Sequence, residues 1–459
     1  MKNNNKERFL IMKEKIENFS ERFSRNNWLI LLLFGTIGQL AWTVENMYFN
    51  LFVYETIAPD LDTVTLMVQL SGIVATVATL VAGALSDKIG NRRSFISVGY
   101  AIWGVTVALF GCLSTNLTET LLGVDFARAL SITLVLVVVG DCVMTLFGST
   151  ANDAAFNAWV TDNTRPSYRG RVEGVLSILP LISMLIVAGG FGIIKDLIGY
   201  RALFIALGCV ISLSGIFGIF FIKDSDTLER NGGFKDILYG FKPSAIKSNV
   251  PFYVALLVVV IYSIAAQIFM PFIIIFMTTY LHFSVIEYSL VFGGAILAGA
   301  ALNLYLTRLS DKKDKMNMLY LAAAIFAVGL FGMYFASMLK EKIALLIAFT
   351  IGGFVMITGF ILITALCGSI VRDNTPSNAV GKLQGVRMVF SVLIPMLAGP
   401  AIGNAINAGM GIKLENPGAD AMTTEYIPAP EIFLAGAIAT LLVFAVIPVL
   451  KKVRNDNSK

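Results

Sequence analysis

The stretch Gly83-Ala-Leu-Ser-Asp87-Lys88-Ile-Gly90-Asn-Arg92-Arg93 decides the fold, because it is a short polar turn between two long apolar runs. Its glycines permit a tight reversal of the chain. Its second half carries basic side chains, and Lys and Arg in short loops are retained on the cytoplasmic side of a membrane. The stretch therefore predicts two membrane-spanning helices that meet in a hairpin at the inner membrane face.

The composition of the whole chain is that of a membrane protein. Of its 459 residues, 56% are hydrophobic and only 14% are charged, and the mean hydropathy is +0.77. A soluble domain carries about 25% charged residues, and a membrane span requires about 20 apolar residues. Twelve candidate spans are centred near residues 40, 75, 104, 143, 183, 212, 264, 298, 327, 355, 394 and 441. We therefore expect an all-α membrane protein with twelve transmembrane helices.

The distribution of basic residues predicts the orientation. With both termini inside, the tails and inner loops hold 28 of the 35 Lys and Arg residues, and the outer loops hold six. This bias predicts a multi-pass protein of the cell membrane with both termini in the cytoplasm. It also accounts for the net charge of +5 without a nucleic-acid partner. The four cysteines are scattered without metal or redox spacing, and no cofactor is expected.

The second half of the chain repeats the first. The segment 162–175 (DNTRPSYRGRVEGV) aligns without gaps on 373–386 (DNTPSNAVGKLQGV), at an offset of 211 residues. A second match joins 85–88 (LSDK) to 309–312 (LSDK), at an offset of 224. Two inner loops that match in the same order predict a parallel duplication of a six-span unit.

A polar segment near the middle of the chain predicts the domain boundary. It carries charges of both signs and a glycine pair, as linkers do. The first residues place Phe9, Met12, Ile16 and Phe19 at helical spacing, which predicts an amphipathic helix on the inner membrane surface; a solvated tail is the alternative. The predicted division is an N-terminal amphipathic segment, a first six-helix half, a cytoplasmic linker, a second six-helix half and a cytoplasmic tail, at residues 1–27, 28–222, 223–250, 251–450 and 451–459.

These features together resemble the major facilitator superfamily. The loop between its helices 2 and 3 reads Gly-x-x-x-Asp-basic-x-Gly-basic-basic, and here Asn91 replaces the first of the final basic pair. The Pro166-x-x-Arg169-Gly170-Arg171 pattern is also common in that family. The resemblance implies two six-helix halves that rock about a central solute site. Within the family the chain more remotely resembles glycoside–pentoside–hexuronide cation symporters and sucrose-type carriers, although it lacks the helix-2 carboxylates of the melibiose-permease type.

The resemblance also implies an inner latch formed by Asp87, Arg92 and Arg93. An aspartate at the end of span 2 is stabilised near the positive N-terminus of a facing helix, and such contacts would hold the outward-open state. The alternative is a loop that only sets topology. The same inner network is expected to include Asp153, Arg169, Arg171, Glu173, Asp311 and Arg387.

Glu45 and Asp141 lie within predicted spans and are the candidate coupling residues. A carboxylate in a span costs roughly 3 kcal/mol or more, and such residues usually mark ion or substrate paths. Neither has a basic partner at similar depth in the sequence, and desolvation favours the neutral form, so a proton or a cation is expected to neutralise them. The alternative is a protonated acid that donates one hydrogen bond between helices.

A stripe of amides and aromatic side chains predicts the solute site. Amides would hydrogen-bond a hydroxyl-rich solute, and an aromatic face would contact a sugar ring. For any single residue, ordinary bonding between helices is the alternative. No Lys or Arg appears at mid-depth, which disfavours an anionic solute. The candidate residues are Gln39, Trp42, Asn46, Asn50 and Asn152 in the first half, and Tyr262, Gln267 and Asn303 in the second.

The sequence therefore predicts a secondary active transporter and not an enzyme. It would act as a monomer and move a small polar organic solute, with a sugar or glycoside as first candidate, by symport with a proton or sodium ion. The runner-up is a proton-coupled exporter of amphiphilic compounds, although span 5 lacks the Gly-Pro pair of many antiporters. A third alternative is a transporter-like sensor, which would be expected to carry a larger cytoplasmic domain than the linker and tails provide.

Overall fold

The computed structural model describes residues 23–164, 169–224, 239–310, 314–376, 380–413 and 426–457. Eleven helical stretches in this part of the chain are long and apolar enough to cross a membrane. The longest, Gly174–Phe221, bends at Gly199, whose φ of 78° is not helical, so it contains two of the expected spans. The predicted all-α membrane fold is confirmed. The amphipathic segment, apart from its last five residues, lies outside the described residues, as does half of the linker, residues 225–238.

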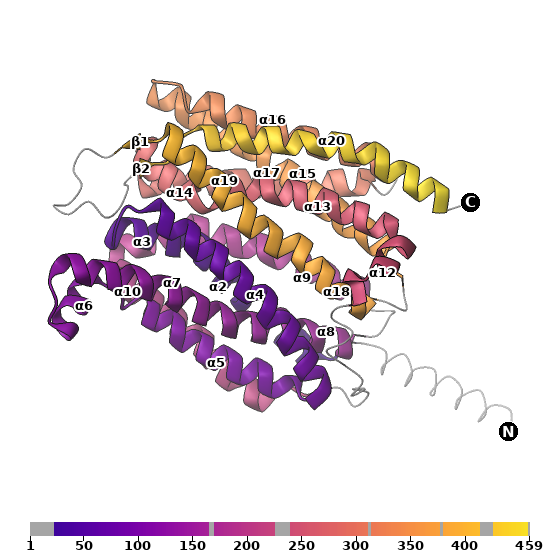
Figure 1. Cartoon of the computed structure of the whole chain (residues 1–459), viewed down its shortest axis with the longest axis horizontal. Helices are drawn as coiled ribbons and strands as arrows, with labels where there is room; N and C mark the ends of the chain where they lie inside the picture. The colour runs from indigo at the N-terminus through magenta and orange to yellow at the C-terminus, as the bar shows by residue number, and fades with distance from the viewer. Residues whose placement is uncertain are drawn as a thin grey trace, which may run out of the picture.

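The two halves lie side by side, the first drawn in indigo to magenta and the second in rose through orange to yellow (Figure 1). The first half consists of α2 (Arg25–Val44), η1 (Glu45–Phe49), α3 (Asn50–Thr56), α4 (Leu61–Ile89), α5 (Arg92–Phe110), α6 (Thr115–Leu122), α7 (Phe126–Gly148), η2 (Ser149–Phe156), α8 (Asn157–Asn163), α9 (Arg169–Ile186), η3 (Val187–Phe191) and α10 (Gly192–Phe221).

The rest of the described chain begins with two short helices at the end of the linker and continues with the second half. Its elements are η4 (Tyr239–Phe241), α12 (Pro243–Ser248), α13 (Val250–Phe269), η5 (Met270–Phe272), α14 (Ile273–Ile275), η6 (Phe276–Tyr280), α15 (Val285–Ser310), α16 (Lys315–Ala336), α17 (Lys342–Asp373), α18 (Val380–Met388), η7 (Val389–Leu393), α19 (Ile394–Met410), β1 (Ile412–Lys413), β2 (Tyr426–Ile427) and α20 (Glu431–Asn457). We call the end of the molecule where α20 finishes the tail end, and the end that carries β1 and β2 the hairpin end (Figure 1).

The turn between α4 and α5 has the tight geometry that its sequence predicts. Gly90 ends α4 in the left-handed region with a φ of 69°, where a glycine is favoured. The Asn91 side chain accepts a hydrogen bond of 2.9 Å from the Ser94 N–H and so caps α5. The asparagine that departs from the family pattern therefore begins the next helix.

Within each half, pairs of helices approach at backbone distance. A Cβ atom added to Gly208 of α10 would lie 2.4 Å from the Gly104 carbonyl oxygen of α5, and one added to Gly104 would lie 2.3 Å from the Gly208 carbonyl oxygen. In the second half, a Cβ on Gly329 of α16 would lie 2.1 Å from the Met356 nitrogen of α17. Small residues permit such close packing where lipid supplies no hydrophobic driving force.

Five π-helical segments, η1, η2, η3, η6 and η7, interrupt the described spans. A π turn holds more residues than an α turn, so it rotates every side chain beyond it relative to an α-helical projection. These segments matter for the site because η1 begins at Glu45 and η2 contains both Asn152 and Asp153.

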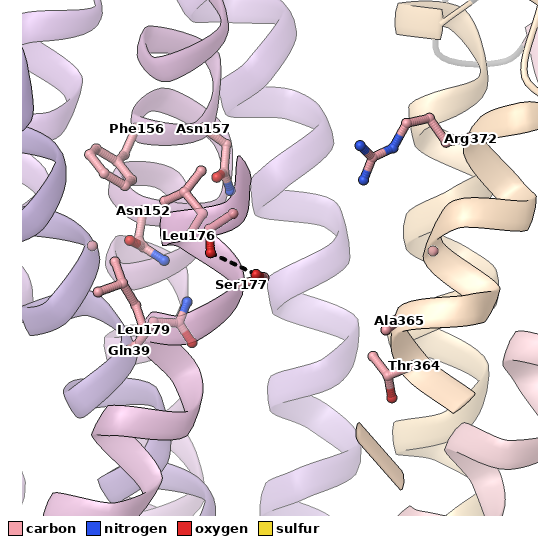
Figure 2. Close-up of a pocket in the computed structure, with 13 residues that line it drawn as sticks. Gln39, Asn152, Phe156, Asn157, Leu176, Ser177, Leu179, Thr364, Ala365 and Arg372 are labelled. Atoms are coloured by element: carbon pink, nitrogen blue, oxygen red, sulfur yellow. Dashed lines mark hydrogen bonds between the residues drawn. The ribbon is translucent and has the colours of Figure 1, made fainter. Parts of the chain in front are cut away.

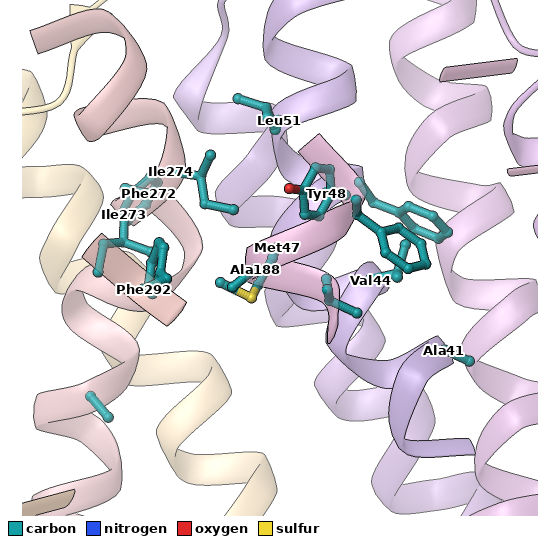
Figure 3. Close-up of a cluster of buried hydrophobic side chains, with 14 of the residues drawn as sticks. Ala41, Val44, Met47, Tyr48, Leu51, Ala188, Phe272, Ile273, Ile274 and Phe292 are labelled. Atoms are coloured by element: carbon teal, nitrogen blue, oxygen red, sulfur yellow. The ribbon is translucent and has the colours of Figure 1, made fainter. Parts of the chain in front are cut away.

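The halves close on each other near the hairpin end. Met47, Tyr48, Leu51 and Ala188 face Phe272, Ile273, Ile274 and Phe292 across the boundary (Figure 3), and all eight are buried. Hydrogen bonds join the halves around this apolar plug. They run from Asn404 Nδ2 to Asp62 Oδ1 (2.5 Å), from the Tyr54 hydroxyl to the Tyr426 carbonyl (3.0 Å), from Gln69 Nε2 to the Leu397 carbonyl (2.8 Å) and from Asn50 Nδ2 to the Pro271 carbonyl (3.4 Å).

Candidate functional site

A cavity of about 560 Å³ separates the halves between mid-depth and the tail end. The first half lines it with α2, η2, α8 and α9, and the second half lines it with α17 across the gap (Figure 2). Amide, hydroxyl and guanidinium groups alternate with apolar side chains on its walls. The lining residues are Gly35, Gln39, Asn152, Phe156, Asn157, Gly174, Leu176, Ser177, Leu179, Thr364, Ala365, Gly368 and Arg372.

Two of the predicted solute-binding residues, Gln39 and Asn152, line this cavity. Trp42 lies behind the wall, where its ring packs 5.0 Å from that of Trp103. Asn46 donates to the Trp42 carbonyl at 2.7 Å, and Asn50 reaches the other half at the plug. For Asn46 and Asn50 the observed bonds are therefore those of the alternative interpretation, bonding within and between helices.

The three candidates of the second half also lie outside the cavity wall. Asn303 is buried and donates to the Gly299 carbonyl at 2.9 Å and the Thr358 carbonyl at 3.1 Å, which ties α15 to α17. Gln267 packs against α19, because a Cβ on Gly399 would lie 2.3 Å from its own Cβ. Tyr262 is buried one layer behind the cavity, with its hydroxyl facing Thr364.

Several polar residues of the cavity were not predicted from the sequence: Asn157, Ser177, Thr364 and Arg372. Thr364 and Ser177 carry no signal that distinguishes them from other hydroxyls in membrane helices. Arg372 is exposed, stands in the last turn of α17 and points across the gap (Figure 2). An anionic solute was disfavoured because no Lys or Arg was expected at mid-depth. Arg372 places a positive charge at the tail-end mouth of the cavity instead.

Glu45 and Asp141 are both buried near the first-half wall, with 9% and 3% of their surfaces exposed. The Thr145 hydroxyl donates to Glu45 Oε1 at 2.9 Å, and the Ser71 hydroxyl faces the Asp141 carboxyl group. Glu45 Oε2 and Asp141 Oδ1 have no hydrogen-bond partner among the described residues. The two groups influence each other electrostatically, and no Lys or Arg of the described part is paired with either. The structure thus brings the two predicted coupling residues into one cluster.

Asp153 lies close to the same cluster, and its membership of the inner network stays a prediction. It is half-buried, accepts a hydrogen bond of 3.1 Å from Asn152 Nδ2, and lies close enough to influence Glu45. Asn152 and Asp153 both lie in η2, which winds as a π-helix.

The inner latch residues are bound within the first half at the tail end. The guanidinium of Arg92 is buried and donates to Asp87, to Asp162 Oδ2 at 3.0 Å and to Ser86 Oγ at 2.5 Å. Arg93 donates to the Ile219 carbonyl, and its backbone N–H donates to Asp224 at 2.9 Å. These bonds tie α4, α5, α8 and the end of α10 together. A latch between the two halves stays a prediction.

The remaining members of the predicted inner network are only partly described. Asp311 and the side chains of Arg169 and Glu173 lie outside the described part of the chain. Arg171 on α9 and Arg387 on α18 are exposed near the tail end. Asp162, which the sequence analysis did not single out, is the carboxylate that joins α8 to Arg92.

Replacing Arg92 with Ala should lower the thermal stability of the purified protein by several degrees. The substitution leaves Asp87 and Asp162 without their shared cation and removes the hydrogen bonds of a buried guanidinium, and a hydrogen bond to a charged group contributes about 1.5–3 kcal/mol. Thermal denaturation in detergent measures the effect. Lys342→Ala is the matched control, because its pair with Glu287 (2.9 Å) has a lysine side chain that is 60% exposed, and such pairs contribute about 1 kcal/mol or less. Equal shifts for both variants would contradict the structural role assigned to Arg92.

Comparisons with known proteins agree with this architecture. The model of the Major Facilitator Superfamily matches residues 31–400. Among solved structures, the chain is similar to a mutant of the nucleoside transporter NupG, with a TM-score of 0.66, 10% identity and coverage of 92% of this chain and 99% of that one. It is also similar to a bacterial homologue of the human lysosomal transporter Spinster, described as inward-facing and occupied (TM-score 0.62, 14% identity, 92% and 96% covered). The Escherichia coli xylose transporter XylE, in a partially occluded inward-open conformation, matches with a TM-score of 0.60, 12% identity and 90% and 97% covered. No curated protein matches the chain by sequence.

Proposed function

The chain belongs to the Major Facilitator Superfamily, and from this premise we propose that it is a symporter of a small polar organic solute. A proton or a cation would travel with the solute, and one monomer would suffice. A sugar or glycoside is the first candidate for the solute. The solved structures named for nucleoside and xylose transport support solutes that are rich in hydroxyl groups.

One observation carries the proposal: a polar cavity between the halves adjoins buried carboxyl groups that have no basic partner. Gln39, Asn152 and Asn157 offer amide groups to a solute in the cavity. Glu45 and Asp141 lie behind the same wall with unpartnered oxygen atoms. An unpaired carboxylate is costly in a membrane span, so each is expected to take up a proton or a cation during the cycle.

The direction in which the cavity faces supports alternating access. The bias of basic residues predicts that the tail end is cytoplasmic. On that assignment the cavity faces the cytoplasm, and the apolar plug and its hydrogen bonds close the outer side. The bonds between the halves would break when the protein opens outward.

Transport into proteoliposomes tests the proposal. The vesicles contain a pH-sensitive dye and are challenged with a panel of sugars, glycosides, nucleosides, amino acids and lipophilic cations, with and without sodium. We expect one polar solute to acidify the lumen on entry and to accumulate against its gradient. Glu45→Gln combined with Asp141→Asn should lower accumulation at least tenfold, toward equilibration, because neither group can then take up a proton.

The matched control is Asp125→Asn, which removes an exposed carboxylate at the hairpin end and should accumulate solute as the parent does. Sodium-dependent uptake without acidification would change the coupling ion and keep the symport. Proton efflux triggered only by lipophilic cations would overturn the proposal in favour of the exporter. Unchanged accumulation in the double variant would show that neither carboxyl group is needed for coupling and that both have a structural role.

A further inference from the structure

Asn152 is part of two environments at once. It lines the cavity beside Gln39 and Leu179 (Figure 2), and its Nδ2 amide donates to Asp153 Oδ1 at 3.1 Å. Its own Oδ1 lies 2.8 Å from the Tyr100 hydroxyl, which also lies 2.8 Å from the Phe34 carbonyl. Because a carboxylate only accepts hydrogen bonds, Nδ2 must face Asp153, and the amide is held from both sides.

The groups that face Asp153 are donors or other acids. The Ser149 hydroxyl and the Trp42 indole N–H point toward its carboxyl group, yet both lack a bonded partner among the described residues. The titratable groups around it are Glu45 on η1, Tyr100 on α5 and, farther along α7, Asp141. The basic side chains Arg92 and Arg93 of α5 are bound to other groups at the tail end.

We propose that Asn152 links solute binding in the cavity to protonation of Asp153, an inference that rests on the proposed function. A solute oxygen that binds Asn152 accepts from the same Nδ2 that serves Asp153 Oδ1. The two N–H groups of Nδ2 then donate to two acceptors, the solute oxygen and Asp153 Oδ1. These two oxygen atoms lie close together, and they repel each other most when Asp153 carries its negative charge. Bound solute therefore favours the protonated form of Asp153.

Linkage makes the effect reciprocal, so a protonated Asp153 favours the solute. This sign is the one that symport requires, since solute and proton bind together. Asp153 is half-buried and is the chain neighbour of Asn152, which lines the cavity. Asn152 is thus a positioning residue between the solute and the carboxyl cluster, and Asp153 is the acid of that cluster nearest the cavity.

Two matched variants separate this role from a simple contact. Xylose, sucrose and uridine serve as probes, and their binding to purified protein is measured between pH 5.5 and 8.5. In the parent protein, affinity for the probe that binds should rise about tenfold as the pH falls, which corresponds to a coupling free energy of about 1.4 kcal/mol. Asn152→Ala should weaken binding and flatten this pH dependence.

Asn157→Ala is the control, because Asn157 also lines the cavity but donates to the backbone carbonyl of Asp153, at 3.1 Å. It should weaken binding and keep the tenfold pH dependence. Size-exclusion profiles establish that each variant is folded. The same pH dependence in Asn152→Ala and Asn157→Ala would overturn the inference.

A second readout does not need a solute. Infrared difference spectra of the solute-free protein record the C=O band of protonated carboxyl groups as the pH is lowered. Asp153→Asn should remove one component of this band, and Asn152→Ala should make that component appear at higher pH, because the ionised form loses a donor. If no probe binds the parent protein, the proposed solute class fails, and this readout still decides the inference. Spectra of Asn152→Ala that match the parent would overturn it.

Discussion

A short thiol crosslinker that joins Asp62→Cys to Asn404→Cys should reduce transport to background. These two side chains meet at 2.5 Å across the boundary between the halves at the hairpin end. A covalent bridge holds α4 and α19 together there, so the cavity can no longer open on that side. The experiment uses a background without the four native cysteines and a reducible bis-methanethiosulfonate reagent, and it measures solute uptake by proteoliposomes before and after reduction.

The matched control places the same bridge within one half. Lys315 and Asp373 pair at 2.6 Å between α16 and α17, and both side chains are accessible. Crosslinking Lys315→Cys to Asp373→Cys should leave most of the uptake intact, because the two helices belong to the same half. Uptake that survives the bridge between residues 62 and 404 would show that the halves do not separate at the hairpin end, and alternating access as proposed would be wrong.

Gly208→Val should prevent the chain from accumulating as a folded, monodisperse protein. A Cβ at Gly208 would lie 2.4 Å from the Gly104 carbonyl oxygen and 2.8 Å from the Ala108 nitrogen. These are backbone atoms of α5 and cannot turn aside as a flexible side chain would. Overpacking typically costs 1–3 kcal/mol, and we expect at least about 3 kcal/mol here, because α5 and α10 must move apart along their length.

Gly294→Val is the control for this substitution, since Gly294 lies within α15, is exposed, and has no atom within 4 Å of an added Cβ. It imposes the same change in helix propensity without the collision. Yield and thermal denaturation in detergent compare the two variants, with Gly208→Ala expected between them. A Gly208→Val protein as stable as Gly294→Val would contradict the close approach of α5 and α10.

Much of the fold could be predicted because the membrane restricts the chain to a few solutions. Span lengths, the charge bias and the repeated loops are all local signals, and the turn at Gly90 and Asn91 was readable from its residue types. The partner of Arg92 was not readable, because Asp162 lies 70 residues away and reaches it only once α8 and α5 are packed.

The candidate site was harder to predict, since it depends on how each helix is rotated about its own axis and on which side chains therefore face the cavity. Gln39 and Asn152 line the cavity, and they could be singled out because polar side chains within spans usually face a cavity or another helix. The hydrogen bond between Asn152 and Asp153 was not expected, because it depends on side-chain orientation within η2, and no residue pattern in 149–156 marks that segment as a π-helix. Asn303 was expected at the solute site and bonds two backbone carbonyls inside the second half, because an amide in either role has the same sequence signature.

The two halves contribute different kinds of groups to three of the hydrogen bonds around the plug. Asn50, Tyr54 and Gln69 of the first half all donate from side chains, and their acceptors in the second half, at Pro271, Tyr426 and Leu397, are main-chain carbonyls. Every amino acid has a main-chain carbonyl, so a substitution at those three acceptor positions need not remove the bond. Substitutions at the three acceptor positions of the second half should therefore be tolerated better than substitutions at the three donor positions of the first half. Only the first half needs particular side chains to form these three bonds.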